Sequence, residues 1–389
     1  MTSIDNILPR LHRHAWMDEQ IEAFRDQVRR YVTAELAPQL EGWRRQGYIP
    51  REAWRPFGEL GFMLPELDEE WGGAGANLAY QLVVQDELAR AEVPANTAVH
   101  TIAAHYILDY GTEEQKRRWL PKLASGEMLA GIAMTEPGCG SDLKSMRTRA
   151  RREGDEYVID GAKTFITNGF TANLLVVALR TGEAGSRGVS LIVLETEKLP
   201  GFAVGRRLEK LGQHASDTAE LSFQGVRVPA SHLLGGQEGQ GFKQLMSQLP
   251  YERMLLAVPA AATIERAVEL TVEYTTQRQA FGQSVASFQN TRFKLAECAT
   301  LAHVVRSFVN DCVQRLLDGT LDDEAAYMAK WWTTEQQCKV MDECLQLFGG
   351  YGYMAEYPIA RLYADSRVQK IYGGTNEIMK DLIARKLLG

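Results

Sequence analysis

The chain has 389 residues, of which 45% are hydrophobic and 24% are charged. These values are ordinary for a globular protein and leave room for two or three domains. The formal net charge of −7 argues against a nucleic-acid partner or an anionic membrane surface. No apolar run approaches the roughly 20 residues that a membrane helix needs, and the N-terminal segment lacks a signal-peptide pattern, so we expect a cytoplasmic protein.

The cysteines and histidines indicate no metal site. There are five cysteines, none in a C-x-x-C pair: Cys139, Cys298, Cys312, Cys338 and Cys344. Most lie in helical-looking segments, as is typical of reduced, buried thiols. The seven histidines show no spacing that places two ligands on one helix face. We expect His12 and His14 to belong to a solvated N-terminal segment.

Hydrophobic periodicity divides the chain into three parts. Residues 1–128 are dominated by apolar residues three or four apart, which predicts a helical domain. Residues 129–240 contain short runs rich in β-branched residues and separated by glycine, which predict a β domain. Over residues 241–389 long amphipathic segments with short connections predict a helix bundle. The predicted fold class is mainly α with a β middle domain.

Four runs of the middle part are predicted strands. They read EYVIDGAKTFITNG, NLLVVALRTG, GVSLIVLET and TAELSFQGVRVP. The last run alternates polar and apolar residues, which is typical of a sheet with one face in water.

An acid and a base stand side by side at the start of a long apolar run, in the stretch SQLPYERMLLAVPA. Pro250 favours the first turn of a helix, because its fixed φ suits that position. Glu252 then falls in the same turn, where the partial positive charge of the helix N-terminus stabilises a carboxylate. Taken alone, this stretch is explained by helix electrostatics, and a catalytic role for Glu252 needs support from elsewhere in the chain.

Two stretches of the middle part suit a flat polar ligand. AMTEPGCGSDLKS, residues 133–145, offers backbone N–H groups and hydroxyls, which suit a polar heterocycle or a phosphate. KTFITNG, residues 163–169, adds an aromatic ring and a hydroxyl. The alternative is a plain turn in which Glu136 and Asp142 bind the backbone.

Three stretches of the C-terminal part combine glycine with chemistry-bearing side chains: RQAFGQSVASFQ, QLFGGYGYMAEYPIARLYAD and IYGGTNEI. The first presents a cation and an aromatic ring between two predicted helices. In the other two, glycine lets the backbone approach a ligand closely, and the last precedes a helix N-terminus, which favours an anion. Ordinary helix ends explain the same glycines.

Together and in this order, these stretches resemble the acyl-CoA dehydrogenases. AMTEPGCGSDLKS fits the first signature of that family and QLFGGYGYMAEYPIARLYAD fits the second, and the resemblance spans essentially the whole chain. It implies an N-terminal helical domain, a β-barrel-like middle domain and a C-terminal four-helix bundle, with FAD bound between the last two. It also implies a homotetramer, a dimer of dimers, in which each flavin receives contacts from a neighbouring subunit.

The resemblance implies roles for individual residues. Those expected to line the flavin ring and its phosphates are Ile132, Met134, Thr135, Ser141, Phe165 and Thr167. Those expected to reach the FAD of a neighbouring subunit are Arg278, Phe281, Gln289, Gln346, Gly349 and Gly350. Thr375 and Glu377 would touch the bound flavin nucleotide, and the substrate would meet Ser141, Tyr251 and Arg253.

The resemblance also identifies a catalytic base. Most members keep a glutamate after the Ile-Tyr pair of the loop written here IYGGT, where this chain has Gly373. The long-chain and isovaleryl-CoA dehydrogenases place the glutamate on the helix written here LPYER, and this chain has Glu252 there. We therefore expect Glu252 to take the α proton of a thioester, while the backbone N–H of Gly373 stabilises the thioester oxygen. A bound acyl chain is expected to raise the pKa of Glu252 by desolvation.

The implied activity is α,β-dehydrogenation of a saturated acyl-CoA to the trans-2-enoyl-CoA, with a preference for medium to long or branched chains and electron-transfer flavoprotein as the electron acceptor. One alternative is another enzyme on the same fold, a flavin-dependent acyl oxidase or a dehydrogenase of carrier-protein-bound acyl groups. A second is a non-catalytic acyl-CoA-binding protein, against which Glu252 and both signatures argue. A nicotinamide Rossmann enzyme is disfavoured, because no G-x-G-x-x-G links a strand to a helix.

Overall fold

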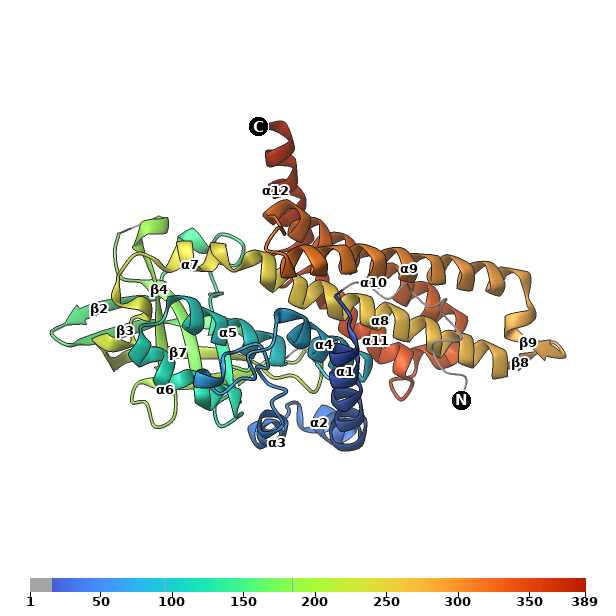
Figure 1. The fold of residues 1–389 in the computed structure, drawn as a ribbon, viewed down its shortest axis with the longest axis horizontal. Coiled ribbons are helices and arrows are strands. Elements are labelled where there is room, and N and C mark those ends of the chain that lie inside the picture. Colours follow the sequence, from blue (N-terminus) through green and yellow to red (C-terminus); the bar gives the residue numbers. More distant parts are fainter. Residues whose placement is uncertain (1–15, 95, 184) are drawn as a thin grey trace.

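The computed structural model describes residues 16–94, 96–183 and 185–389, so the segment with His12 and His14 lies outside the described residues. Helices come first along the chain, a sheet follows, and long helices end it (Figure 1). The predicted fold class is confirmed.

The N-terminal part is a set of helices, three of which, α1, α4 and α6, start at a capping side chain. Their bounds are α1 (Glu19–Tyr31), α2 (Leu40–Gln46), α3 (Arg55–Glu59), α4 (Leu78–Arg90), α5 (Asn96–Tyr110) and α6 (Glu113–Ala124). The carboxylate of Asp18 accepts from the backbone N–H of Ile21, which starts α1. Thr112 and Gln115 form a capping box at the start of α6.

The middle part is a curled seven-stranded sheet in the order β1-β4-β2-β3-β7-β6, with β5 paired to β4. The strands are β1 (Ala130–Ala133), β2 (Arg149–Glu153), β3 (Glu156–Thr167), β4 (Leu174–Arg180), β5 (Val189–Glu195), β6 (Phe202–Arg207) and β7 (Thr218–Pro229). The four predicted strands correspond to β3, β4, β5 and β7. Strand β4 is buried on both faces, and Val176 packs with the N-terminal helices whereas Val177 packs inside the curled sheet.

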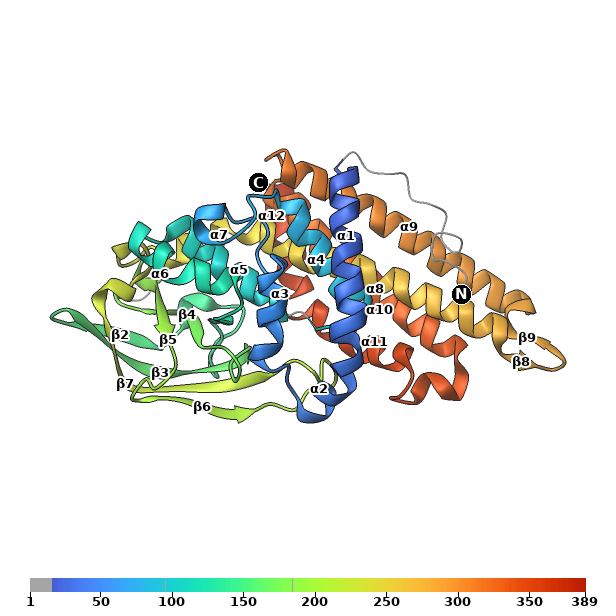
Figure 2. The same cartoon turned by 60° about the horizontal axis from the view of Figure 1, so that its bottom comes forward.

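The C-terminal part is a bundle of long helices. Its helices are α7 (Gly241–Ser247), α8 (Leu249–Gln277), α9 (Gln289–Leu317), α10 (Asp323–Leu347), α11 (Pro358–Ser366) and α12 (Asn376–Leu388). Figure 2 shows α8, α9 and α10 side by side along the long axis of the molecule. A short hairpin, β8 (Gln279–Ala280) and β9 (Gln283–Ser284), joins α8 to α9.

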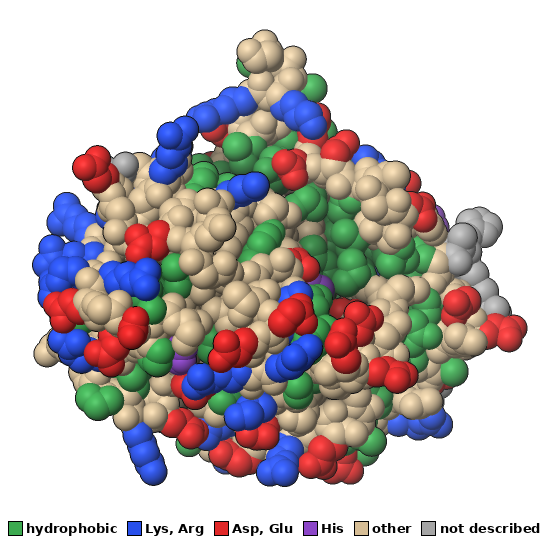
Figure 3. Space-filling view, turned by 60° about the vertical axis from the view of Figure 1, so that its left-hand side comes forward, with side chains coloured by type: hydrophobic (Ala, Val, Ile, Leu, Met, Phe, Trp, Pro, Cys, Tyr) green, Lys and Arg blue, Asp and Glu red, His purple; other side chains and the backbone are tan. Residues whose placement is uncertain are grey.

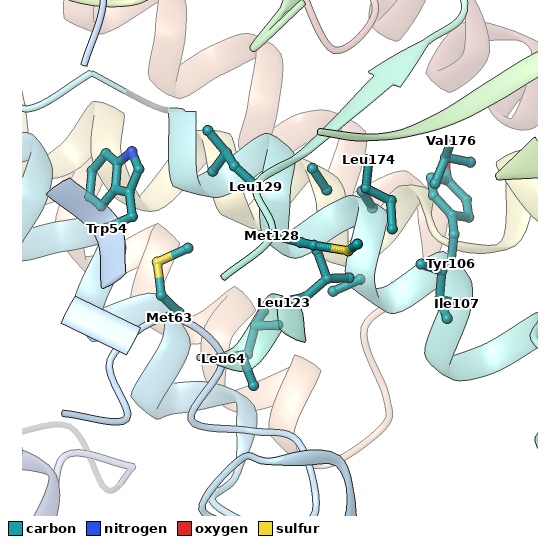
Figure 4. Packing of buried hydrophobic residues seen from close by; sticks show 14 of the residues in the cluster. Trp54, Met63, Leu64, Tyr106, Ile107, Leu123, Met128, Leu129, Leu174 and Val176 are labelled. Carbon is teal, nitrogen blue, oxygen red and sulfur yellow. The ribbon is translucent and has the colours of Figure 1, made fainter. Parts of the chain in front are cut away.

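Helix α5 links the N-terminal helices to the sheet. The backbone N–H of Ala130 in β1 donates to Nδ1 of His100, 3.1 Å away. The carboxamides of Asn96 and Asn168 are joined by a 2.6 Å hydrogen bond between α5 and the residue after β3. Figure 4 shows the hydrophobic cluster at this junction, to which α5 contributes Tyr106 and β4 contributes Val176.

A buried ion cluster joins α4 to the bundle. The guanidinium of Arg306 in α9 lies 2.7 Å from Asp86 of α4 and 2.6 Å from Glu265 of α8. Arg90 of α4 lies 2.8 Å from Glu265 and 2.5 Å from Glu269. These charges are largely removed from water and satisfied by one another, so loss of one partner leaves others uncompensated.

The cysteine prediction holds for four of the five residues. Cys139, Cys298, Cys312 and Cys344 are buried free thiols, whereas Cys338 is only partly buried. Within the described residues no group of His, Cys, Asp and Glu is arranged to hold a metal ion, and no helix is long and apolar enough to cross a membrane.

We expect Arg306→Met to reduce the free energy of unfolding by about 3 kcal/mol, the low end for a broken buried pair, because Arg25 still pairs with Asp86 and Arg90 with Glu265. Urea unfolding followed by far-UV circular dichroism measures the change. The control Arg385→Met breaks an exposed pair with Asp381 and is expected to cost less than about 1 kcal/mol. Equal losses in the two variants would contradict a structural role for the buried cluster.

Candidate active site

The proposed base lies at the start of α8, directly after α7. Pro250 occupies the first turn, as predicted, and the backbone N–H of Glu252 donates to the carbonyl of Gln248 at 3.1 Å. The whole Glu252 residue is only 7% exposed. A carboxylate that served only to stabilise a helix end would remain in water, so its burial needs another explanation.

Among the described residues, two side chains contact the carboxylate of Glu252. The hydroxyl of Tyr106, on α5, donates to Oε1 at 2.5 Å. The guanidinium of Arg253 lies 3.5 Å from Oε2. Burial raises the pKa of Glu252, and although the charge of Arg253 and the hydrogen bond from Tyr106 act in the opposite direction, burial prevails. Burial in the protein alone therefore already raises this pKa. The further rise expected from a bound acyl chain stays a prediction.

The loop that carries Gly373 faces the same side of α8. Gly373 and Gly374 both have positive φ, +60° and +85°. A Cβ placed on Gly373 would lie 2.3 Å from Cδ1 of Leu256. Leu256 follows Glu252 by one helical turn and shares its face. The structure thus places Gly373 against the helical turn that follows Glu252, where Leu256 occupies the space that a side chain at Gly373 would need.

An exposed aromatic ring, that of Phe165, lies near the C-terminal end of β3. The pairing of β3 with β7 is interrupted between Lys163 and Ile166, and Phe165 within this bulge has φ +58° and is 67% exposed. A bulge re-aims a side chain, and a non-glycine residue with positive φ is often found at a functional site. The backbone N–H of Thr164 donates to the carbonyl of Thr135 at 2.9 Å, which holds the end of β1 beside this ring.

The residues around Phe165 fit a flat cofactor with polar edges. Ile132 and Met134 are partly buried, and Ser141 lies in the exposed loop between β1 and β2. The hydroxyls of Thr135, Ser141 and Thr167 have no hydrogen-bond partner in the described part of the chain and are free for a ligand. The exposed ring can stack against an isoalloxazine, and the free hydroxyls can hydrogen-bond its polar edge.

Glu136, in the same loop, has a structural role. Its carboxylate accepts from the backbone N–H groups of Arg147 and Thr148 at 2.6 and 2.9 Å. It also accepts from Nζ of the buried Lys163 at 2.9 Å. The alternative of a backbone-binding carboxylate therefore holds for Glu136, and this binding shapes the loop that carries Ser141.

The second group of predicted flavin contacts lies at the opposite end of the molecule. Its members are Arg278, Phe281, Gln289, Gln346, Gly349 and Gly350, and all are exposed. They surround the β8–β9 hairpin and the end of α10, far from the sheet (Figure 1). An open cavity of about 550 Å³ lies here, and Arg278 stands over the ring of Tyr351 at 5.5 Å. Within one chain, this group and Phe165 are not brought together.

The remaining predicted residues lie near the start of α12 or of α8. Thr375 caps α12 by accepting from the backbone N–H of Ile378 at 3.3 Å, and Glu377 is exposed in the first turn. Arg253 lies close to the Gly373 loop, because its Nη2 is 3.4 Å from where a Cβ on Gly374 would stand. Tyr251 is buried against His105, with ring centroids 4.6 Å apart, and its hydroxyl has no partner within the described chain.

Sequence reasoning missed Tyr106, the hydrogen-bond donor to the base. It lies 146 residues before Glu252 in the chain, within an apolar helical run that looks like core.

Figure 3 views the molecule from the side of the middle domain, where hydrophobic side chains line a hollow below the protruding C-terminal helix.

The three parts of the chain match three family models. Residues 18–127 match the acyl-CoA dehydrogenase N-terminal domain, 131–226 the middle domain and 239–388 the C-terminal domain. The chain belongs to the acyl-CoA dehydrogenase family.

Similar proteins cover nearly the whole chain. The mitochondrial long-chain specific acyl-CoA dehydrogenase of Mus musculus is 44% identical over 372 residues, which cover 94% of this chain and 86% of the relative. The crystal structure of an acyl-CoA dehydrogenase from Geobacillus kaustophilus has a TM-score of 0.94 at 46% identity, and the match covers 96% of this chain and 99% of that chain. A glutaryl-CoA dehydrogenase from Mycobacterium smegmatis, solved in complex with FADH2, has a TM-score of 0.89 at 29% identity and covers 95% of both chains.

Family membership and the fit of the residues agree on the chemistry. The protein is a flavin-dependent oxidoreductase that acts on acyl-CoA, and its cofactor is FAD. The group around Phe165 on β1 and β3 offers the ring contacts, and Glu252 on α8 offers a buried carboxylate.

We expect Tyr106→Phe to shift the pH profile of flavin reduction. The bond from Tyr106 favours the ionised carboxylate of Glu252, so its loss raises the pKa of Glu252 further. Because the base must be ionised, the acid limb of the reduction rate moves to higher pH. Stopped-flow reduction by an acyl-CoA across a pH series measures this limb.

Tyr110→Phe is the matched control. Tyr110 follows Tyr106 by one turn of α5, but its hydroxyl bonds Ser247 instead of the base. Its acid limb should coincide with that of the wild type. Identical acid limbs in both variants would show that the contact with Tyr106 does not set the ionisation of Glu252.

Proposed function

We propose that the protein removes the α and β hydrogens of a saturated acyl-CoA and releases the trans-2-enoyl-CoA, with Glu252 as the base. The observation that carries this proposal is the burial of the Glu252 carboxylate on α8, one helical turn before Leu256, which lies against Gly373. A medium to long or branched acyl chain is proposed as the substrate, and the name of the mouse long-chain relative supports the longer part of that range.

The chain's own groups divide the reaction between them. Glu252 accepts the proton from the α-carbon, and the electron pair of that C–H bond forms the new double bond as the β hydrogen leaves as hydride. Bound FAD supplies the acceptor for that hydride. The backbone N–H of Gly373 donates to the thioester oxygen as negative charge develops there. Arg253, beside both groups, would meet the CoA portion together with Ser141, and Tyr251 would contact the substrate.

Burial strengthens the proposed base. A carboxylate in water has a pKa near 4.3 and is a weak base toward a thioester α-carbon. Burial raises the pKa of Glu252, which increases its proton affinity. The hydrogen bond from Tyr106 keeps the carboxylate oriented, so the base is held in place before the substrate arrives.

A homotetramer, as a dimer of dimers, accounts for the second group of flavin contacts. Arg278, Phe281, Gln289 and Gln346 have no side-chain hydrogen bond or ion pair in the described part of the chain, and Phe281 is 97% exposed. Exposed aromatic and cationic side chains beside an open cavity are typical of a surface that contacts another molecule. In this proposal that molecule is the FAD of a neighbouring subunit, and Thr375 and Glu377 contact the nucleotide bound by their own subunit.

Electrons from the reduced flavin are proposed to pass to electron-transfer flavoprotein. Measuring peroxide formation with and without electron-transfer flavoprotein separates this acceptor from oxygen and so from the oxidase alternative. Replacing the acyl-CoA by the same acyl group on a carrier protein tests the other enzyme alternative. The cytoplasmic location stays a prediction.

Glu252→Gln tests the proposed function. The amide keeps the shape of the side chain but is not a base, so flavin reduction by acyl-CoA should fall by roughly 10² to 10⁴-fold. Binding should persist, so acyl-CoA should still perturb the flavin spectrum of this variant. The assay is anaerobic bleaching of the flavin with a panel of acyl-CoAs of increasing length and branching.

Glu273→Gln, on the exposed side of the same helix, is the control and should reduce at the wild-type rate. Near-normal reduction by Glu252→Gln would remove Glu252 from the mechanism. A wild-type flavin that no acyl-CoA in the panel bleaches would contradict the proposed reaction itself.

Arg278→Ala tests the second flavin group. Because Arg278 is proposed to contact the FAD of a neighbour, its loss should weaken FAD retention and the tetramer together. The FAD to protein ratio after gel filtration and the mass from light scattering measure both. Arg30→Ala removes another exposed arginine, on α1, and should change neither quantity. Unchanged flavin content and mass in Arg278→Ala would contradict the placement across a subunit boundary.

A further inference from the structure

A fully buried lysine holds the loop that carries Gly373. Lys330 lies on α10 and is 0% exposed. Its Nζ donates to the carbonyl of Gly374 at 2.6 Å and to the carboxamide oxygen of Asn376 at 3.0 Å. Within the described chain its ammonium group contacts no carboxylate. One of its acceptors lies in the loop between Ile371 and α12, and the other is the first residue of α12.

This position is costly for a cation. Burial lowers the pKa of Lys330 to about 7, and the charge of Arg253 on α8 acts in the same direction, whereas Glu377 on α12 opposes it. Buried lysines are rare unless they are paired with an anion. A hydrophobic residue would fill the same space at lower cost, so a packing role alone does not explain Lys330.

The hydrogen bond from Lys330 to Gly374 is made at a pair of glycines, where the backbone has the most conformational freedom. Gly373 and Gly374 both adopt positive φ, and glycine has the largest conformational freedom of any residue. A backbone N–H that must point at a thioester oxygen needs its orientation fixed from outside such a pair. The contact of Lys330 with the carbonyl of Gly374 supplies that restraint directly after Gly373.

Asn376 anchors the other end of the loop in the same network. Its carboxamide oxygen also accepts from the hydroxyl of Thr334 at 3.2 Å. Its carboxamide nitrogen donates to the carbonyl of Trp331 and to Glu335, both at 3.2 Å. Four residues on one face of α10, Lys330 among them, therefore fix the loop on both sides of Thr375.

We propose that Lys330 is a positioning residue for the dehydrogenation: its ammonium group fixes the Gly373–Gly374 backbone so that the N–H of Gly373 is aimed at the thioester oxygen. The proposal rests on the proposed function, since it assigns Gly373 the same role. Lys330 acts through the backbone and touches neither substrate nor base.

The test is Lys330→Met, which keeps a chain of similar length and removes the donor. If the N–H of Gly373 loses its aim, the limiting rate of flavin reduction should fall by about 10 to 10²-fold, below the roughly 10² to 10³-fold seen when a donor is deleted outright. The acyl-CoA concentration for half-maximal rate should stay within about twofold, because the lost interaction forms in the transition state. The matched control is Lys339→Met, an exposed lysine on the same helix, which should behave as wild type.

A second readout separates positioning from a merely structural role. Raman spectra of bound enoyl-CoA labelled with ¹³C at the thioester carbonyl report how strongly that carbonyl is polarised. Lys330→Met should show weaker polarisation at unchanged FAD content and oligomer mass. A purely structural lysine would instead lower FAD content or mass and leave the carbonyl of the remaining holoenzyme unchanged, and that result would overturn the proposal.

Lys330→Gln serves if the methionine variant does not fold, because its amide still donates within the buried site. It should retain FAD, and its limiting rate should lie between those of wild type and Lys330→Met or, where no methionine variant is obtained, about tenfold below wild type. A wild-type rate and a wild-type carbonyl frequency in a folded Lys330 variant would overturn the proposal while leaving the activity and Glu252 in place. Failure of the proposed function is distinct, since the wild-type flavin itself would then not be reduced.

Discussion

The burial of Glu252 between α5 and the start of α8 is the constraint on which the site depends. It raises the pKa of the carboxylate, and it requires a neighbour that satisfies the buried oxygen, which is Tyr106. Helix α5 holds Tyr106 in place because two hydrogen bonds fasten that helix to the sheet. His100 accepts from the backbone N–H of Ala130, and Asn96 donates to Asn168. One buried carboxylate therefore couples all three parts of the chain, and the N-terminal helices, which carry no predicted site residue, contribute Tyr106 to the proposed catalytic site.

The sequence predicts the architecture well because hydrophobic periodicity survives in the long elements. The strands it misses are short or polar. β1 has only four residues, β2 reads RARRE, and the residues of β6 after Phe202 are exposed. None of the three offers the alternation or the β-branched run by which a strand is identified. Their pairing partners, which lie elsewhere in the chain, determine that they are strands at all.

The site is predictable only where a motif or a local rule names the residue. Pro250 places Glu252 in a first turn, and IYGGT places Gly373 before a helix. Tyr106 and Lys330 could not be found in this way, because each sits in an ordinary helical pattern and acquires its meaning from a partner far along the chain. A polar side chain on an apolar helix face can belong to the core or to a functional site. Its role depends on the side chains that it contacts in the tertiary structure, which the local sequence does not show.

The position of the base is tied to the choice of residue at 373. With glycine there, the loop adopts positive φ and approaches α8 so closely that Leu256 fills the space of a side chain. A carboxylate on that loop would have to displace Leu256 and strain the backbone. On α8 the carboxylate is carried by a rigid helix, and in the proposed function the Gly373 loop only has to present a backbone N–H. When the base and the N–H donor are on different elements, the flexible Gly373–Gly374 pair must be fixed by contacts with other residues. The hydrogen bonds of Lys330 to Gly374 and to Asn376 provide such contacts. Base and N–H donor are then fixed by different helices, α8 and α10, and the packing of these two helices in the bundle sets the distance between them.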